Sequence, residues 1–125
     1  MANRDLWGTD FAVPKIVTPI TLLRETAALL SEKTTGLVLA EVVVQESLRG
    51  GLTARFYLVA PRLDNYRYQV FSIDYRLDGY PVKLRFGSQE SICEDEAGFE
   101  TAVGEILAHQ ATRTVIGSLI DLVSE

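Results

Sequence analysis

The alternation of apolar and polar positions is clearest between Phe71 and Phe86, where two alternating runs flank the dipeptide Asp78-Gly79. Asp-Gly is a frequent sequence in two-residue hairpin turns. With such a turn, the sequence predicts these cross-strand pairs: Leu77 with Tyr80, Tyr75 with Val82, Ile73 with Leu84, Phe71 with Phe86, Asp74 with Lys83, and Ser72 with Arg85. One side of the hairpin is then apolar or aromatic and the other polar, which indicates a half-buried antiparallel sheet.

A second hairpin is predicted upstream, where the valine-rich run Leu37–Leu48 is joined to Leu52–Ala60 by Arg49-Gly50-Gly51. A three-residue loop keeps the apolar faces together, whereas a two-residue loop mixes them. The expected pairs are Val44 with Phe56, Val42 with Leu58, and Ala40 with Ala60. Together with strands Tyr66–Leu77 and Tyr80–Phe86, these runs predict a four-stranded antiparallel meander.

Apolar residues recur at helical spacing before and after the predicted strands. Thr18-Pro19 is a typical helix start, and the apolar stripe that follows predicts a helix from Pro19 to Thr35, ended by Gly36. After a polar loop from Gly87 to Ile92, Glu94-Asp95-Glu96 opens a second helix, because acidic side chains stabilise a helix N-terminus. Thr112 is expected to cap a third.

The predicted fold is therefore α+β, in the order α-β-β-β-β-α-α, with the helices packed on one face of the sheet. Residues 1–17 lack a sustained period and contain Gly8 and Pro14, which predicts an N-terminal arm. Its Trp7 and Phe11 are expected to dock on a surface. Residues 18–125 are expected to form a single α+β domain.

Composition is that of an ordinary globular chain: 125 residues, 47% hydrophobic and 23% charged. The single cysteine, Cys93, excludes an internal disulfide and fits a reducing compartment. No apolar stretch reaches the length of a membrane span, and the first residues do not form a secretory signal. We therefore expect a bacterial cytoplasmic protein with no membrane association.

The net charge of −5 is unevenly distributed. Between Arg49 and Gly87 there are seven basic and three acidic residues, whereas the rest of the chain has five basic and fourteen acidic residues. The middle of the chain is thus a positive block between negative ends, which either forms solvated faces or binds an acidic partner.

The sequence contains few residues arranged as catalytic sites require. A nucleophilic site would need to pair Cys93 with His109, the only histidine, but the acidic residues after Cys93 oppose a thiolate. Glu94, Asp95 and Glu96 are consecutive and would point in different directions on a helix, so they do not converge on a metal ion. Phosphate-loop, dinucleotide, CxxC, HExxH and GxSxG motifs are absent from the sequence. We expect no enzymatic activity, no cofactor and no metal.

The sheet face opposite the helices is the remaining candidate surface. It is predicted to present Glu41, Val43, Arg55, Tyr57, Tyr68, Val70, Asp74, Arg76, Lys83 and Arg85. Tyrosine also suits exposed strands for structural reasons alone. Tyr and Arg are nevertheless enriched in binding hot spots, so the predicted binding residues are Arg55, Tyr57, Tyr68, Arg76 and Arg85.

The predicted function is a small non-enzymatic interaction domain that binds a protein partner, as an adaptor, chaperone, antitoxin or immunity protein does. The alternative is a nucleic-acid or small-ligand binder that uses the same Arg/Tyr face, although the acidic total charge weighs against nucleic acid. The Leu37–Val44 edge carries no proline or lysine, whereas Tyr80–Phe86 carries both. The former edge is expected either to lie under the arm or to form a homodimer.

Overall fold

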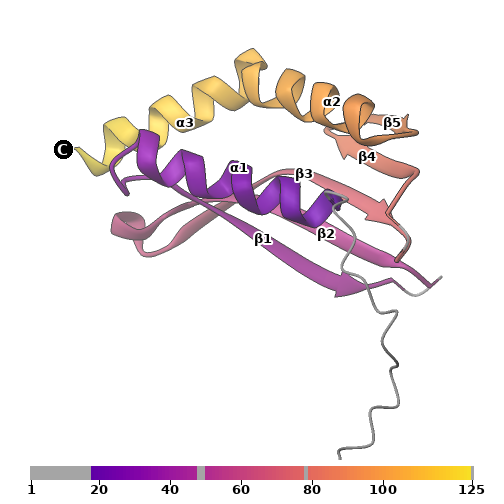
Figure 1. Cartoon of the computed structure of the whole chain (residues 1–125). Helices are drawn as coiled ribbons and strands as arrows, with labels where there is room; N and C mark the ends of the chain where they lie inside the picture. The colour runs from indigo at the N-terminus through magenta and orange to yellow at the C-terminus, as the bar shows by residue number, and fades with distance from the viewer. Residues whose placement is uncertain (1–17, 48–49, 78, 125) are drawn as a thin grey trace, which may run out of the picture.

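The computed structural model describes residues 18–47, 50–77 and 79–124. Its elements are α1 (Pro19–Lys33), β1 (Leu39–Glu46), β2 (Leu52–Ala60), the short 3-10 helix η1 (Pro61–Leu63), β3 (Tyr66–Tyr75), β4 (Val82–Phe86), β5 (Gln89–Cys93), α2 (Glu96–Ala108) and α3 (Gln110–Val123). The strands form an antiparallel sheet in the order β1-β2-β3-β4-β5, with the helices on one side (Figure 1). The α+β class is confirmed. The predicted arm, residues 1–17, lies outside the described residues.

Strand β5 was not predicted from the sequence. It occupies part of the segment expected to be a loop and is paired with β4 from Val82↔Cys93 to Phe86↔Gln89. Gly87 and Ser88 therefore form a two-residue connection, in which Gly87 has φ +61°, as the first turn residue of a type II′ hairpin does. The sheet has five strands, and its second edge is β5 instead of the predicted Tyr80–Phe86.

The predicted pairing of β1 with β2 is wrong by two residues. Val42 lies opposite Phe56, and Val44 lies opposite Ala54. The ladder ends at Glu46↔Leu52, so the connection covers residues 47–51 instead of three residues. A shift of two residues leaves every side chain on its expected face, which is why face matching did not detect it.

The predicted pairing of β3 with β4 is confirmed at Ser72↔Arg85, Ile73↔Leu84 and Asp74↔Lys83. The strands end earlier than expected: β3 stops at Tyr75 and β4 begins at Val82. The Leu77 side chain is 87% exposed and belongs to the connection, which contradicts its predicted pairing with Tyr80. Asp78 lies outside the described residues.

A β-bulge at Val70 divides β3 into two halves. Phe56 pairs with Phe71 and the next residue, Tyr57, pairs with Gln69, so Val70 is an extra residue on β3. Val70 and Phe71 are consecutive and both buried, at 5% and 2% exposure. The bulge reverses the alternation before it. Tyr68 consequently lies opposite Leu58, on the side that faces the helices.

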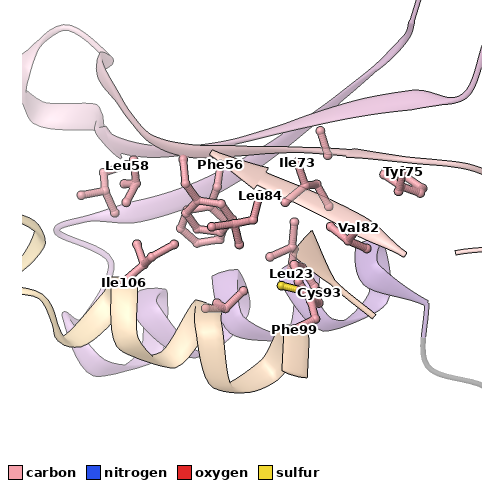
Figure 2. Packing of buried hydrophobic residues seen from close by; sticks show 14 of the residues in the cluster. Leu23, Phe56, Leu58, Ile73, Tyr75, Val82, Leu84, Cys93, Phe99 and Ile106 are labelled. Carbon is pink, nitrogen blue, oxygen red and sulfur yellow. The ribbon is translucent and has the colours of Figure 1, made fainter. Parts of the chain in front are cut away.

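The core lies between the sheet and the helices (Figure 2). Phe56 and Phe71 stack across β2 and β3 with ring centroids 5.0 Å apart. Leu23 of α1 and Phe99 of α2 are fully buried against the sheet. Fully burying such side chains stabilises the fold by about 1.5–3 kcal/mol each.

Helix starts follow the predicted chemistry at two of three positions. Thr18 caps α1, accepting a hydrogen bond from Thr21 N at 3.2 Å, and Asp95 caps α2, accepting one from Gly98 N at 2.8 Å. The predicted Thr112 cap of α3 is wrong, because α3 begins at Gln110 and His109 Nδ1 accepts from Ala111 N at 3.1 Å. Thr112 is instead buried inside the helix.

Candidate functional site

The candidate site is the outer face, defined as the sheet side away from the helices (Figure 1). The pairing register assigns the following side chains to it: Leu39, Glu41, Val43 and Gln45 of β1; Thr53, Arg55, Tyr57 and Val59 of β2; Arg67, Gln69, Ser72 and Asp74 of β3; Lys83 and Arg85 of β4; and Glu90 and Ile92 of β5. Most of these side chains are partly or fully exposed, and Val59 is the buried exception. The outer face thus mixes aliphatic, aromatic and charged groups.

Three of the five predicted binding residues share the outer face: Arg55, Tyr57 and Arg85. Tyr68 does not, because the Val70 bulge turns it to the opposite side, where it is 37% exposed. Arg76 lies beyond the end of β3, in the connection to β4, and is itself exposed. The bulge also moves Val70 into the core.

Most charges at the β3–β5 side of the outer face neutralise one another. Arg85 lies between two carboxylates, with Asp74 Oδ2 at 3.1 Å and Glu90 Oε1 at 3.0 Å. Lys83 Nζ lies 3.7 Å from Glu90 Oε1. The ion pair across the hairpin is therefore diagonal, Asp74 to Arg85, instead of the directly opposed Asp74 to Lys83 that the sequence predicted. Thr53 Oγ1 donates to Asp74 Oδ1 at 2.7 Å and orients that carboxylate.

Arg67 is an outer-face residue that the sequence analysis missed. Its guanidinium forms an ion pair with Glu41 and lies over the Tyr57 ring, 5.5 Å from the centroid. Such a contact limits the conformations of the Tyr57 ring and adds a cation–π interaction. The signal that could have revealed Arg67 is the doublet Val70-Phe71, because two adjacent apolar residues break the alternation of an otherwise regular strand.

Arg55 differs from the other outer-face cations in its partner. Its side chain donates to the neutral Gln45 amide oxygen, and the ion pairs found in the described part of the chain do not include Arg55. Arg55 also lines an open polar cavity of about 680 Å³. The cavity is lined by Gln45, Glu46, Ser47, Gly50, Thr53, Arg55, Asp74, Lys83 and Arg85. An arginine whose charge is not neutralised is suited to receive a carboxylate from outside.

Cys93 and His109 each have a local environment that explains their presence. Burial raises the pKa of the Cys93 thiol, and the nearby Asp95 carboxylate raises it further, which opposes thiolate formation. His109 uses Nδ1 to cap α3, and its ring packs edge-on against Phe86 with centroids 5.2 Å apart. The structure therefore gives both residues structural roles.

Residues 18–47, 50–77 and 79–124 also bear on metal binding and on membrane insertion. Within these ranges, acidic, histidine and cysteine side chains form no group of three suited to holding a metal ion. The helices of the same ranges are each too short or too polar to cross a bilayer.

Comparisons of this chain with protein-family models, with curated proteins and with solved structures gave no match.

Proposed function

We propose that this protein is a non-enzymatic interaction domain that binds a protein partner through the outer face, as an adaptor, chaperone, antitoxin or immunity protein does. The observation that carries the proposal is the side of the sheet that the helices leave uncovered, with Arg55 and Tyr57 on its second strand (Figure 1). Tyr and Arg, together with Trp, are enriched among the hot-spot residues near the centre of protein interfaces.

The chemistry of the partner follows from the residues around Arg55. A carboxylate of the partner would pair with the Arg55 guanidinium, displacing or sharing the Gln45 amide. An apolar side chain would pack on Tyr57 and Val43, which are diagonal neighbours, since Tyr57 lies opposite Glu41 and Val43 lies opposite Arg55. Arg67 already constrains the Tyr57 ring, so less conformational entropy is lost on binding.

Charge pairing favours a protein over nucleic acid. The described outer-face residues include four basic and three acidic side chains, and all three acids lie in ion pairs with arginine or lysine. A nucleic-acid surface needs several cations free to contact phosphates. Nucleic acid or a small anion at Arg55 therefore remains the second candidate.

The test is site-specific crosslinking followed by affinity measurement. A photoreactive amino acid at position 57, and separately at Glu105 on α2, is exposed to native lysate, and the species crosslinked only from position 57 is purified. We expect Arg55→Glu and Tyr57→Ala each to weaken its binding by about thirtyfold, the effect of losing a hot spot of about 2 kcal/mol. The control Arg62→Glu, an exposed charge reversal in η1, should change affinity less than about twofold.

The experiment distinguishes three outcomes. Equal losses in all three variants, or none in Arg55→Glu and Tyr57→Ala, would contradict binding through the outer face. If the crosslinked species is nucleic acid and its affinity falls steeply with salt, the second candidate replaces the first. A protein partner should retain most of its affinity at moderate salt.

Two finer expectations belong to the same proposal. We infer that the protein acts in a bacterial cytoplasm, which a buried free thiol at Cys93 supports. We also infer a homodimer through β1, which lies at one edge of the sheet and pairs with β2. A single monomeric species in light scattering over a wide concentration range would contradict the homodimer.

A further inference from the structure

A second candidate binding site lies on the other side of the sheet, between α1 and the segment where α2 ends and α3 begins. It is a groove of about 330 Å³. The groove is lined by Thr26, Leu29, Leu30 and Lys33 of α1, Phe56 and Leu58 of β2, Leu107 of α2, and Arg113 and Ile116 of α3. A cavity of about 150 Å³ holds benzene, so this groove accommodates a ligand of about a dozen non-hydrogen atoms.

The groove has a closed apolar floor and an open apolar rim. Phe56 and Leu58 at the floor are 1% and 0% exposed, so the sheet seals the bottom. Leu29 at the rim is 53% exposed, although it is a large aliphatic side chain on the helix that faces α3. Covering Leu29 with an apolar ligand would remove this surface from water, which is favourable.

Positive charge stands beside the apolar walls. Lys33 and Arg113 are the ionisable residues of the lining, and the lining contains no acidic side chain. Arg113 Nε donates to the Leu107 carbonyl at 3.1 Å, which holds the guanidinium against the groove and leaves its terminal nitrogens free of that bond. Neither cation takes part in the ion pairs of the described residues.

We propose that this groove binds a small amphipathic anion with an aliphatic body and a single carboxylate, the chemical class of a medium-chain fatty acid. The chain lies on Leu29, Leu107 and Ile116, and the carboxylate meets Lys33 and Arg113. Charge complementarity selects this occupant, because apolar walls alone would accept a neutral or cationic chain equally well. The groove and the outer face lie on opposite sides of the sheet, so this proposal is independent of the protein-binding one.

The test compares three probes of equal chain length, measured by titration calorimetry and by amide chemical shifts. The probes are decanoate, decanol and decyltrimethylammonium. We expect decanoate to bind at least about tenfold more tightly than the other two and to shift the amides of Leu29, Leu107 and Arg113. Absence of decanoate binding, or equal affinity for the three probes, would overturn the proposal.

Variants locate the charge effect. Lys33→Met with Arg113→Met removes both cations while keeping the aliphatic stems and good helix propensity. The double variant should lose at least about tenfold in decanoate affinity and bind decanol as the wild type does. The matched control is Lys83→Met with Arg62→Met, which removes two cations that do not line the groove and should leave decanoate affinity unchanged. Equal losses in the two double variants would show a nonspecific effect of net charge.

A blocking variant and a second occupant complete the design. Ile116→Trp should fill the groove and abolish binding of all three probes if the fold is intact by circular dichroism, whereas the Met variants test the proposal even if this one misfolds. A second copy of the chain is the competing occupant. If Leu29→Glu converts a dimer into a monomer and decanoate does not bind, the groove is an interface between copies and the proposal is wrong.

Discussion

Gly51 tests the connection between β1 and β2 more sharply than any other position. Its φ is +87°, and a Cβ atom built there would lie 2.7 Å from the Tyr75 carbonyl oxygen on β3. The neighbouring Gly50 has a similar φ of +79°, but a Cβ atom there would meet nothing within 4 Å. Alanine at either position thus meets the same backbone penalty, and only alanine at Gly51 also meets the backbone of another strand.

The magnitudes separate the two effects. Left-handed backbone costs an L-residue about 1–2 kcal/mol, and the reduced entropy of the unfolded chain returns about 0.4–1 kcal/mol of this. Gly50→Ala should therefore lower the free energy of unfolding by about 1 kcal/mol. In Gly51→Ala, strand β3 or the connection must also move, since 2.7 Å is below van der Waals contact. Overpacking of this kind costs about 1–3 kcal/mol, which gives a total loss of about 2–4 kcal/mol.

Urea unfolding of the wild type and the two variants measures this difference. The midpoint should fall in both variants with an unchanged m-value, because the surface exposed on unfolding stays the same. The informative quantity is the difference between the variants, in which the shared backbone penalty cancels. Equal losses for Gly50→Ala and Gly51→Ala would refute the close approach of Gly51 to Tyr75.

Two further predictions concern buried polar groups. Thr112 Oγ1 is buried without a hydrogen-bond partner among the described residues, so Thr112→Val should raise the free energy of unfolding by about 1 kcal/mol in urea titrations, and a loss would show that the hydroxyl is satisfied. Burial raises the pKa of Cys93 above its ordinary 9.0, so the unfolded state loses the thiol proton at a lower pH than the folded state does. The free energy of unfolding should therefore fall as pH rises past about 9. In Cys93→Val this decline with pH should be shallower, and an identical decline would contradict the raised pKa.

The predictable parts of the fold are those where burial allows only one strand register or where local chemistry identifies a helix cap. The register of β3 with β4 follows from matching Ile73 with Leu84 around a short connection, and a shift by one residue would bury charges. The caps at Thr18 and Asp95 follow from local chemistry, because their side-chain oxygens accept from amides three residues ahead.

The parts that were missed depend on information that the apolar pattern does not carry. The register of β1 with β2 is set by the connection at residues 47–51, and a shift of two residues costs nothing in face matching. Strand β5 is exposed at four of five positions, so it shows no apolar alternation, although Gly87-Ser88 is a recognised hairpin dipeptide. His109, not Thr112, caps α3, because a histidine ring nitrogen can also accept a hydrogen bond from a backbone amide.

The outer face could be predicted only in part, and for one physical reason. Arg55, Tyr57 and Arg85 lie where unbroken alternation puts them, because β2 and β4 contain no extra residue. Tyr68 precedes the bulge and changes sides, and Arg67 takes its place on the outer face. The sequence alone supports the surface, but not its full set of side chains.

The Val70 bulge makes the chemistry of the outer face depend on how one extra residue is accommodated in β3, as well as on composition. A chain lacking Val70 would pair without a bulge and would keep Arg67 on the outer face and Tyr68 on the helix side, because Val70 is the extra residue of the ladder. An alignment of such a chain with this one would show the same residues with one gap. Related sequences that differ only by that gap should therefore be grouped with this chain when binding specificity is inferred from shared residues.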